Sequence, residues 1–126
     1  MTMFDMSLIK PNQYPYRKGW LINPHQEHIR KTKIKAVKAV TVNHISTDKQ
    51  MIALYNKKFN ASIESMEGAA LHYVCLMEKI PFLQIRSVSN YIGERDKKKW
   101  KMQAAIDNLN AVLIYLTSTL TLNFKP

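Results

Sequence analysis

Residues 62–90 constrain the fold most, because a predicted strand, a helix and a second strand follow one another there with polar groups at the strand ends. The helical part has apolar residues at spacings of three and four, such as Ala69, Tyr73 and Met77, and residues 82–88 form a nearly continuous apolar run. Ligands of open α/β sheets bind where parallel strands finish. The side chains predicted to meet there are Glu64, Met66, Glu67, Ser89 and Asn90.

The rest of the chain extends this unit into an alternating order of strands and helices. Strands are expected over residues 34–45, 62–66 and 82–88, and helices over about 48–58, 67–79 and 97–121. The last helix carries an apolar stripe made of Ala105, Leu109, Val112, Leu113, Leu116 and Leu120. The order predicts an α/β fold with a mixed or parallel central sheet flanked by helices. Residues 1–30 are expected to form a loop or lid, and residues 31–126 the alternating part of one partial domain.

Length and composition limit the class of protein. A chain of 126 residues with 46% hydrophobic content can bury a single core. No apolar run is long enough to cross a bilayer, and the first residues lack the order of a secretion signal, so we expect a cytoplasmic protein without a membrane partner. Cys75 is expected to be a buried, inert thiol. The four histidines form no metal-binding pattern, and the chain has no glycine-rich phosphate loop, so we expect neither metal nor cofactor.

The net charge of +10 raises nucleic acid as a possible partner. The charge gathers in two clusters, which we call the first basic cluster (Arg30, Lys31, Lys33, Lys35 and Lys38) and the second basic cluster (Arg95, Lys97, Lys98, Lys99 and Lys101). The first alternates with apolar residues, as on the solvated face of an edge strand. Trp100 within the second begins an apolar helical stripe. A nucleic-acid-binding module is therefore the less favoured alternative.

Three charged residues of the 62–90 unit can each be interpreted in two ways. Glu64 and Glu67 precede a helix, where a carboxylate can stabilise the helix dipole or take part in chemistry. Arg86 lies inside an apolar strand, and a buried guanidinium requires a carboxylate or an anionic ligand. Glu64 or Glu67 is a candidate partner of Arg86.

Two motifs resemble one known family. Glu-Ser-Met-Glu-Gly-Ala-Ala at 64–70 and Ile-Pro-Phe-Leu-Gln-Ile-Arg-Ser-Val-Ser-Asn at 80–90 resemble the nucleoside phosphorylase and nucleosidase superfamily. Within this superfamily, Glu-Ser-Met-Glu-Gly-Ala at 64–69 and the segment at 89–100 look closest to the futalosine hydrolase branch. Members of this branch are nucleosidases of an alternative menaquinone pathway. The resemblance implies the carboxy-terminal half of a three-layer phosphorylase/hydrolase-like fold, and a purine nucleoside as the small-molecule partner.

The resemblance also implies roles for the residues that match the family's motifs. Glu67 would accept hydrogen bonds from the ribose 2′- and 3′-hydroxyls, as an ionised carboxylate can, while Met66 packs against the sugar. His44, followed by Ile45, would lie against the purine face, although the family usually has an apolar residue at position 44. Ser89 would hold Asn90 in orientation.

Asn90 bears on the choice of base. Family members that cleave 6-aminopurine nucleosides tend to have Asp at this point, whereas a 6-oxopurine such as hypoxanthine presents acceptors at both N7 and O6 and suits an amide NH2. Asn90 is therefore expected to donate to the departing purine of a 6-oxopurine nucleoside, and so to assist catalysis.

In the family, the glutamate that activates water lies in an amino-terminal half that these residues do not match. We therefore expect a truncated chain that has little or no hydrolase activity alone. A nucleoside phosphorylase of the same superfamily is an alternative. It needs a phosphate site, which Arg86 alone does not establish. A homo-oligomer is expected, because family members pair subunits across these helices.

Overall fold

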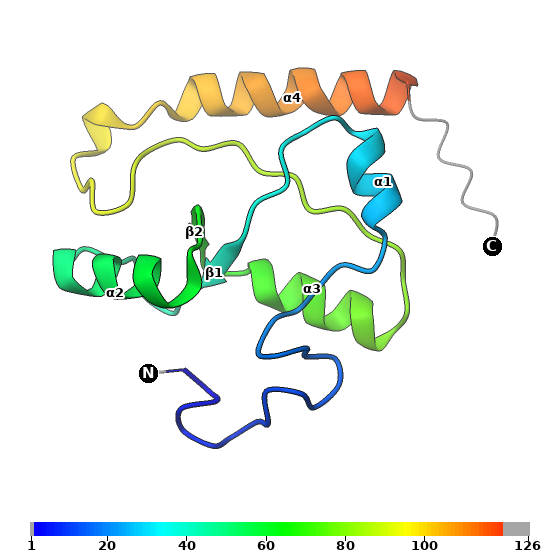
Figure 1. The fold of residues 1–126 in the computed structure, drawn as a ribbon. Helices are drawn as coiled ribbons and strands as arrows, with labels where there is room; N and C mark the ends of the chain where they lie inside the picture. The colour runs from blue at the N-terminus through cyan, green and yellow to red at the C-terminus, as the bar shows by residue number, and fades with distance from the viewer. Residues whose placement is uncertain (1, 120–126) are drawn as a thin grey trace.

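The computed structural model describes residues 2–119, which form a small parallel sheet with helices around it (Figure 1). The elements in chain order are α1 (Gln26–Lys31), β1 (Ala39–Thr41), α2 (Lys49–Phe59), β2 (Ile63–Ser65), α3 (Gly68–Met77), the 3-10 helix η1 (Lys97–Lys99) and α4 (Met102–Thr119). This order confirms the predicted α/β class. The expected stripe residue Leu120 lies outside the described residues.

β1 and β2 form a parallel pair with Ala39 opposite Ile63 and Thr41 opposite Ser65. Two further backbone bonds flank the pair, from Ser62 N to Lys38 O (2.9 Å) and from Val42 N to Ser65 O (2.9 Å). The expectation of one strand over residues 34–45 is therefore wrong in extent. β2 is only three residues long, so it offers no backbone partner to most of that stretch.

α2 agrees with the prediction to within a residue at each end, because both of its caps are encoded locally. The Asp48 carboxylate accepts a hydrogen bond from Met51 N at 2.9 Å, which satisfies one free donor of the first turn. Asn60 ends the helix in the left-handed conformation, with a φ of 47°, and its N–H donates to Asn56 O. Asparagine adopts this conformation more readily than most residues.

The start of α3 is bonded to the ends of both strands. Gly68 N donates to Ser65 Oγ at 3.3 Å, and Ala69 N donates to Thr41 Oγ1 at 2.8 Å. Gly68 is needed here because a Cβ at this position would lie 2.7 Å from Ser65 Oγ. The three elements therefore meet in one fixed junction.

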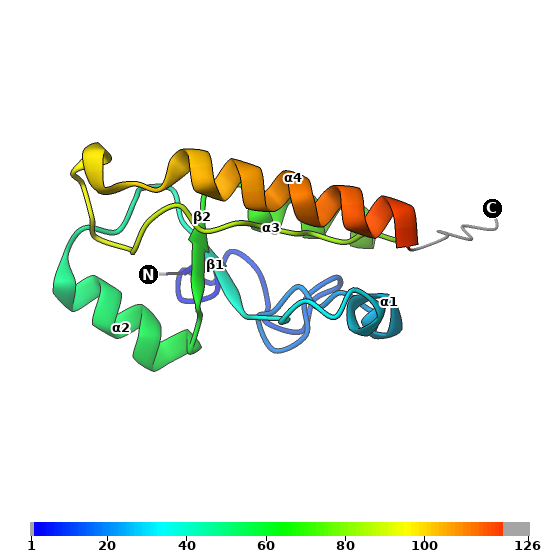
Figure 2. The same ribbon diagram turned by 90° about the horizontal axis from the view of Figure 1, so that it is seen from above.

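Residues 82–88 do not form the expected third strand. They are extended and run alongside α4 in both views (Figures 1 and 2), but they join no strand ladder among the described residues. Side chains bond this segment instead: Asn23 Nδ2 donates to Phe82 O at 2.7 Å, and Gln84 Nε2 donates to Gly68 O at 3.4 Å. The apolar run predicted an extended backbone correctly, but pairing also requires a neighbouring strand in register.

The amino-terminal segment packs on α2 and α3. The Trp20 ring contacts the Phe59 ring, at a centroid distance of 6.2 Å, and Lys38 Nζ lies 5.5 Å from the Trp20 centroid. The Tyr14 hydroxyl donates to Leu76 O, and Lys58 forms a 2.9 Å ion pair with Asp5. Lys38 and Phe59 precede the two strands, so Trp20 lies at the strand-start edge, opposite the strand ends. The loop expected over residues 1–30 also contains α1.

Burial is sparse throughout the described residues. The buried apolar side chains are Cys75, Ala105 and Leu116, which confirms the burial expected for Cys75. The accessible surface is 10243 Å² for a mass of 14.7 kDa, roughly one and a half times that expected of a self-contained globule. α3 has no charged residue from Gly68 to Met77, yet Val74 is 54% exposed. A helix of this composition normally lies in a core.

None of the helices within residues 2–119 combines the length and the apolar character required to cross a membrane.

Candidate functional site

The candidate site is the junction where β1 and β2 end and α3 begins. At the centre of this junction, the buried Ser65 accepts a hydrogen bond from Gly68 N through its hydroxyl oxygen. The Gln84 and Arg86 side chains approach the same point, since a Cβ on Gly68 would lie 3.2 Å from Gln84 Oε1 and 3.3 Å from an Arg86 guanidinium nitrogen. The structure thus brings the 82–88 segment to the strand ends without a ladder.

Met66 and Glu67 connect β2 to α3 and are both exposed. Glu67 occupies the N-cap position of α3, but its side chain makes no capping hydrogen bond. Glu67 therefore does not cap α3 through a side-chain hydrogen bond. The carboxylate is accessible to a ligand and lies at the positive end of the helix dipole.

Glu64 is half-buried, and its carboxylate contacts the chain that leaves β1. Oε1 accepts a hydrogen bond from Ser46 N at 2.9 Å, while Oε2 is buried without a partner in the described part of the chain. His44 and Ile45 immediately precede this bond and are exposed, Ile45 at 57%. Ser46 is buried, and no role at the site was predicted for it from the sequence. Its position just beyond a predicted strand end was the available signal.

Ser89 and Asn90 are linked to each other and to α4. The Ser89 hydroxyl donates to Asn90 Oδ1 at 2.7 Å, and Asn90 Nδ2 donates to Tyr91 O at 3.0 Å. Lys101 N donates to Ser89 O at 2.7 Å, which fixes this end of the segment to the residue before α4. An amide has two N–H donors, so one N–H of Asn90 remains for a ligand.

Arg86 does not form the expected pair with Glu64 or Glu67. Its guanidinium is exposed, and Nε donates to Gln84 Oε1 at 3.3 Å. Among residues 2–119, the salt bridges are Lys31–Glu27, Lys58–Asp5 and Lys99–Glu94. The prediction of a buried ion pair is wrong because the 82–88 segment is not a central strand covered on both faces.

His72 is a titratable group on α3 for which the sequence predicted no role. It is half-buried, with its Nδ1 3.2 Å from Leu21 O and its ring 4.7 Å from the Phe82 ring. Burial lowers the pKa of His72 below its ordinary value of 6.5, and the nearby Arg86 charge acts in the same direction, while the bond to Leu21 opposes them. A carbonyl can only accept, so Nδ1 carries the proton of this bond.

A shallow hollow of about 90 Å³ lies between the 82–88 segment and α4. Its lining residues are Ile34, Ile85, Arg86, Ser87, Asn108, Leu109 and Val112. Drug-sized ligands occupy clefts of roughly 300–1,000 Å³, so this hollow is too small for a nucleoside. Glu67 and Asn90 do not line this hollow.

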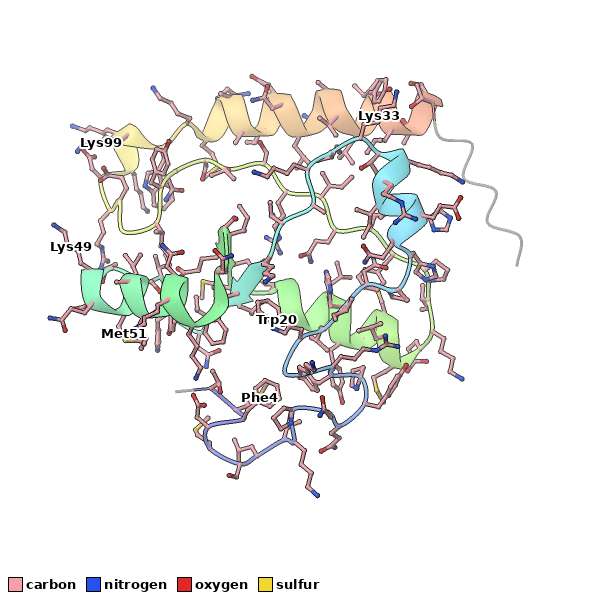
Figure 3. All side chains as sticks on the ribbon, viewed as in Figure 1. Phe4, Trp20, Lys33, Lys49, Met51 and Lys99 are labelled. Atoms are coloured by element: carbon pink, nitrogen blue, oxygen red, sulfur yellow. The ribbon has the colours of Figure 1, made fainter. Side chains whose placement is uncertain are left out.

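Lys33 of the first basic cluster and Lys99 of the second lie apart (Figure 3). Figure 3 shows Lys33 near one end of α4 and Lys99 near the other. Lysines of both clusters are exposed, and Lys99 forms an ion pair with Glu94 at 3.4 Å. The residues of the described range also contain no group of three or more His, Cys, Asp or Glu side chains arranged to hold a metal ion.

The chain belongs to the phosphorylase superfamily, because the model of that family matches residues 20–118. It is similar to the futalosine hydrolase of Thermus thermophilus, with 30% identity over 76 residues. The matched region is 60% of this chain and 34% of that protein, so the chain spans about a third of the length of this relative. No solved structure matches the chain significantly. These matches confirm the resemblance at the level of the family.

Proposed function

We propose that this chain carries the base- and ribose-recognition part of a purine nucleosidase of futalosine hydrolase type, acting on a 6-oxopurine nucleoside. Such an enzyme hydrolyses the N-glycosidic bond of futalosine and releases hypoxanthine and dehypoxanthine futalosine. The superfamily match and the similarity to a futalosine hydrolase support the proposal. By the same resemblance, the reaction would belong to menaquinone biosynthesis.

The observation that carries the proposal is the fixed amide of Asn90. Because the Ser89 hydroxyl donates to Oδ1, the amide oxygen is engaged and the amide nitrogen is turned into the donor role. One N–H of Nδ2 is taken by Tyr91 O, and the second is available to an acceptor. N7 accepts a hydrogen bond in both kinds of purine, but position 6 differs. Hypoxanthine has the acceptor O6 there, whereas adenine has an amino group, which would face an N–H of Asn90 as a second donor.

The chemistry follows from the charges that develop as the glycosidic bond breaks. The departing purine gains negative charge, and a hydrogen bond from Asn90 that strengthens in the transition state assists its departure. Glu67 would accept from the ribose hydroxyls and hold the sugar, since its carboxylate is exposed and makes no capping bond. His44 and Ile45 would lie against the purine, and Met66 against the sugar.

Water is the nucleophile in this proposal, and the resemblance assigns its activation to a glutamate that none of these residues matches. We therefore expect the 126 residues to bind a nucleoside without hydrolysing it efficiently. The large accessible surface and the exposed apolar residues of α3 support assembly with further polypeptide, including the homo-oligomer expected for the family.

A nucleoside phosphorylase is the second candidate, and Arg86 favours it. The guanidinium is exposed, has no carboxylate partner among the described residues and lies beside the start of α3, where the helix dipole is positive. An anion such as phosphate could bind there. The two reactions are distinguished by their products in phosphate buffer, because phosphorolysis yields a ribose 1-phosphate and hydrolysis yields the free sugar.

Binding to the chain itself tests the proposed function. Isothermal titration with inosine, hypoxanthine, adenosine and a mixed-sequence oligonucleotide should give binding of the two 6-oxopurine ligands and weak or no binding of adenosine. Tight oligonucleotide binding with a steep salt dependence, and no binding of inosine, would favour the nucleic-acid module instead.

A further inference from the structure

The residues between β1 and α2 form a short arch that is held at both ends by β2. At one end, Val42 N donates to Ser65 O at 2.9 Å, and at the other, Ser46 N donates to Glu64 Oε1 at 2.9 Å. Only residues 43–45 separate the two bonds, and they include the exposed His44 and Ile45. We call residues 43–45 the arch.

Glu64 holds the arch through a side chain and not through the sheet. It lies opposite Val40 in the strand pair, so its backbone belongs to β2 while its carboxylate reaches a segment 18 residues earlier in the chain. Ser46, which receives this contact, is 8% exposed. A carboxylate accepting from a backbone N–H makes a stronger hydrogen bond than a neutral acceptor would.

The carboxylate has no competing assignment in the described residues. It forms no ion pair with Arg86, whose guanidinium is exposed and bonded to Gln84. Its second oxygen, Oε2, is buried without a hydrogen-bond partner. Burying an oxygen without a hydrogen bond costs free energy. The hydrogen bond from Ser46 N to Oε1 is the interaction of this carboxylate that offsets the cost in the described residues.

We propose that Glu64 is a positioning residue that fixes the arch, and thereby places His44 and Ile45 for contact with the purine base. This inference rests on the proposed function for the identity of the ligand, although the fixation of the arch can be tested without one. It replaces the ion pair expected from the sequence with a different role for the same carboxylate.

Two conservative substitutions separate the reach of the side chain from its charge. Glu64→Gln keeps an Oε1 acceptor at the same distance but removes the charge. Glu64→Asp keeps the charge but is one methylene shorter, so it cannot reach Ser46 N from the same backbone. Glu67→Gln is the control for the exchange measurement alone, because Glu67 is a nearby carboxylate that makes no side-chain capping bond.

The first readout is amide hydrogen exchange, measured residue by residue by NMR on the folded chain and its variants. If Glu64 fixes the arch, the Ser46 amide exchanges about tenfold faster or more in Glu64→Asp, the factor expected when one charge-assisted hydrogen bond is lost. It stays protected in Glu64→Gln and Glu67→Gln. Equal protection of Ser46 in Glu64→Asp and the unsubstituted chain would overturn the proposal.

The second readout is titration with hypoxanthine and inosine. Positioning predicts weaker hypoxanthine binding in Glu64→Asp, by about tenfold, and near-normal binding in Glu64→Gln. Loss of hypoxanthine binding in Glu64→Gln with Ser46 still protected would overturn the proposal, since it would mean that the carboxylate charge acts on the ligand itself. If the unsubstituted chain binds neither ligand, the proposed function fails, whereas the exchange rates still decide whether Glu64 fixes the arch.

Discussion

The Ser89 hydroxyl donates a 2.7 Å hydrogen bond to Oδ1 of Asn90, its neighbour in the chain. The amide is therefore held from its oxygen side, and its nitrogen presents a donor beyond the bond to Tyr91 O. A free asparagine side chain could rotate and offer either group. Ser89 thus fixes which side of the amide presents its N–H donors, as the proposed recognition of a 6-oxopurine requires.

Replacing Ser89 by alanine should weaken base selection more than the fold. Without the hydroxyl, the amide can rotate, and inosine affinity should fall by about 1 kcal/mol, or roughly fivefold, the net value of one neutral hydrogen bond. The ratio of inosine to adenosine affinity, from isothermal titration, should fall too. Ser87→Ala serves as the control, since no side-chain hydrogen bond of Ser87 contributes to the account. An unchanged ratio would count against the role of Ser89.

Removing the Glu67 carboxylate should affect the nucleoside and spare the base. In Glu67→Ala, inosine affinity should fall by about 2 kcal/mol, or roughly 30-fold, because hydrogen bonds to a charged acceptor are lost. Hypoxanthine has no ribose, so its affinity should stay within a factor of two or so of the original. Glu78→Ala is the matched control at the other end of α3. Equal losses for inosine and hypoxanthine would contradict a ribose contact.

Stability should decrease as the pH falls below 6.5, because the pKa of His72 is lowered in the fold. Above this pH, His72 is neutral in both states. Below it, the unfolded chain binds the proton more readily than the folded chain, so the unfolded state is favoured. Urea denaturation between pH 7.5 and 5 should show the decrease, and His72→Gln should remove part of it. A slope that persists in full in the variant would exclude His72 as its source.

The isolated chain should self-associate. Its exposed large apolar residues include Leu71, Val74 and Met77 on α3, and its surface exceeds that of a self-contained globule. Sedimentation velocity across a range of concentrations should show oligomers or aggregates, and Val74→Lys should reduce their share. A monodisperse monomer with a cooperative unfolding transition at all concentrations would show that this surface needs no cover.

The parts of the fold that the sequence predicted well are those determined by neighbouring residues. α2 follows from the cap at Asp48 and the left-handed Asn60, and both act within one turn of the helix. α3 follows from its apolar spacing and from the close approach at Gly68. The prediction of a third strand over 82–88 was wrong. A strand needs a hydrogen-bonded neighbour that lies far away in the sequence, and local patterns do not specify that neighbour.

The sequence proposed members for the candidate site but not all of their contacts. The motifs indicated Glu67, Ser89 and Asn90, and the structure shows the Ser89–Asn90 bond directly. The partner of Glu64 was missed, because a bond between a carboxylate and the backbone of Ser46 leaves no pattern of side-chain types in the sequence. Arg86 was assigned a buried carboxylate partner on the assumption of a covered strand, and its exposure follows from the absence of that strand in the described residues.

The most direct test of the account is the base preference of the chain and of Asn90→Asp, measured by titration with inosine and adenosine at the same pH and salt. We predict that the unsubstituted chain binds inosine more tightly than adenosine by about fivefold or more, the net value of one hydrogen bond. In Asn90→Asp the ratio should move toward adenosine, as a carboxyl oxygen can accept from its amino group. Binding of neither nucleoside, or the same preference in both proteins, would contradict the account.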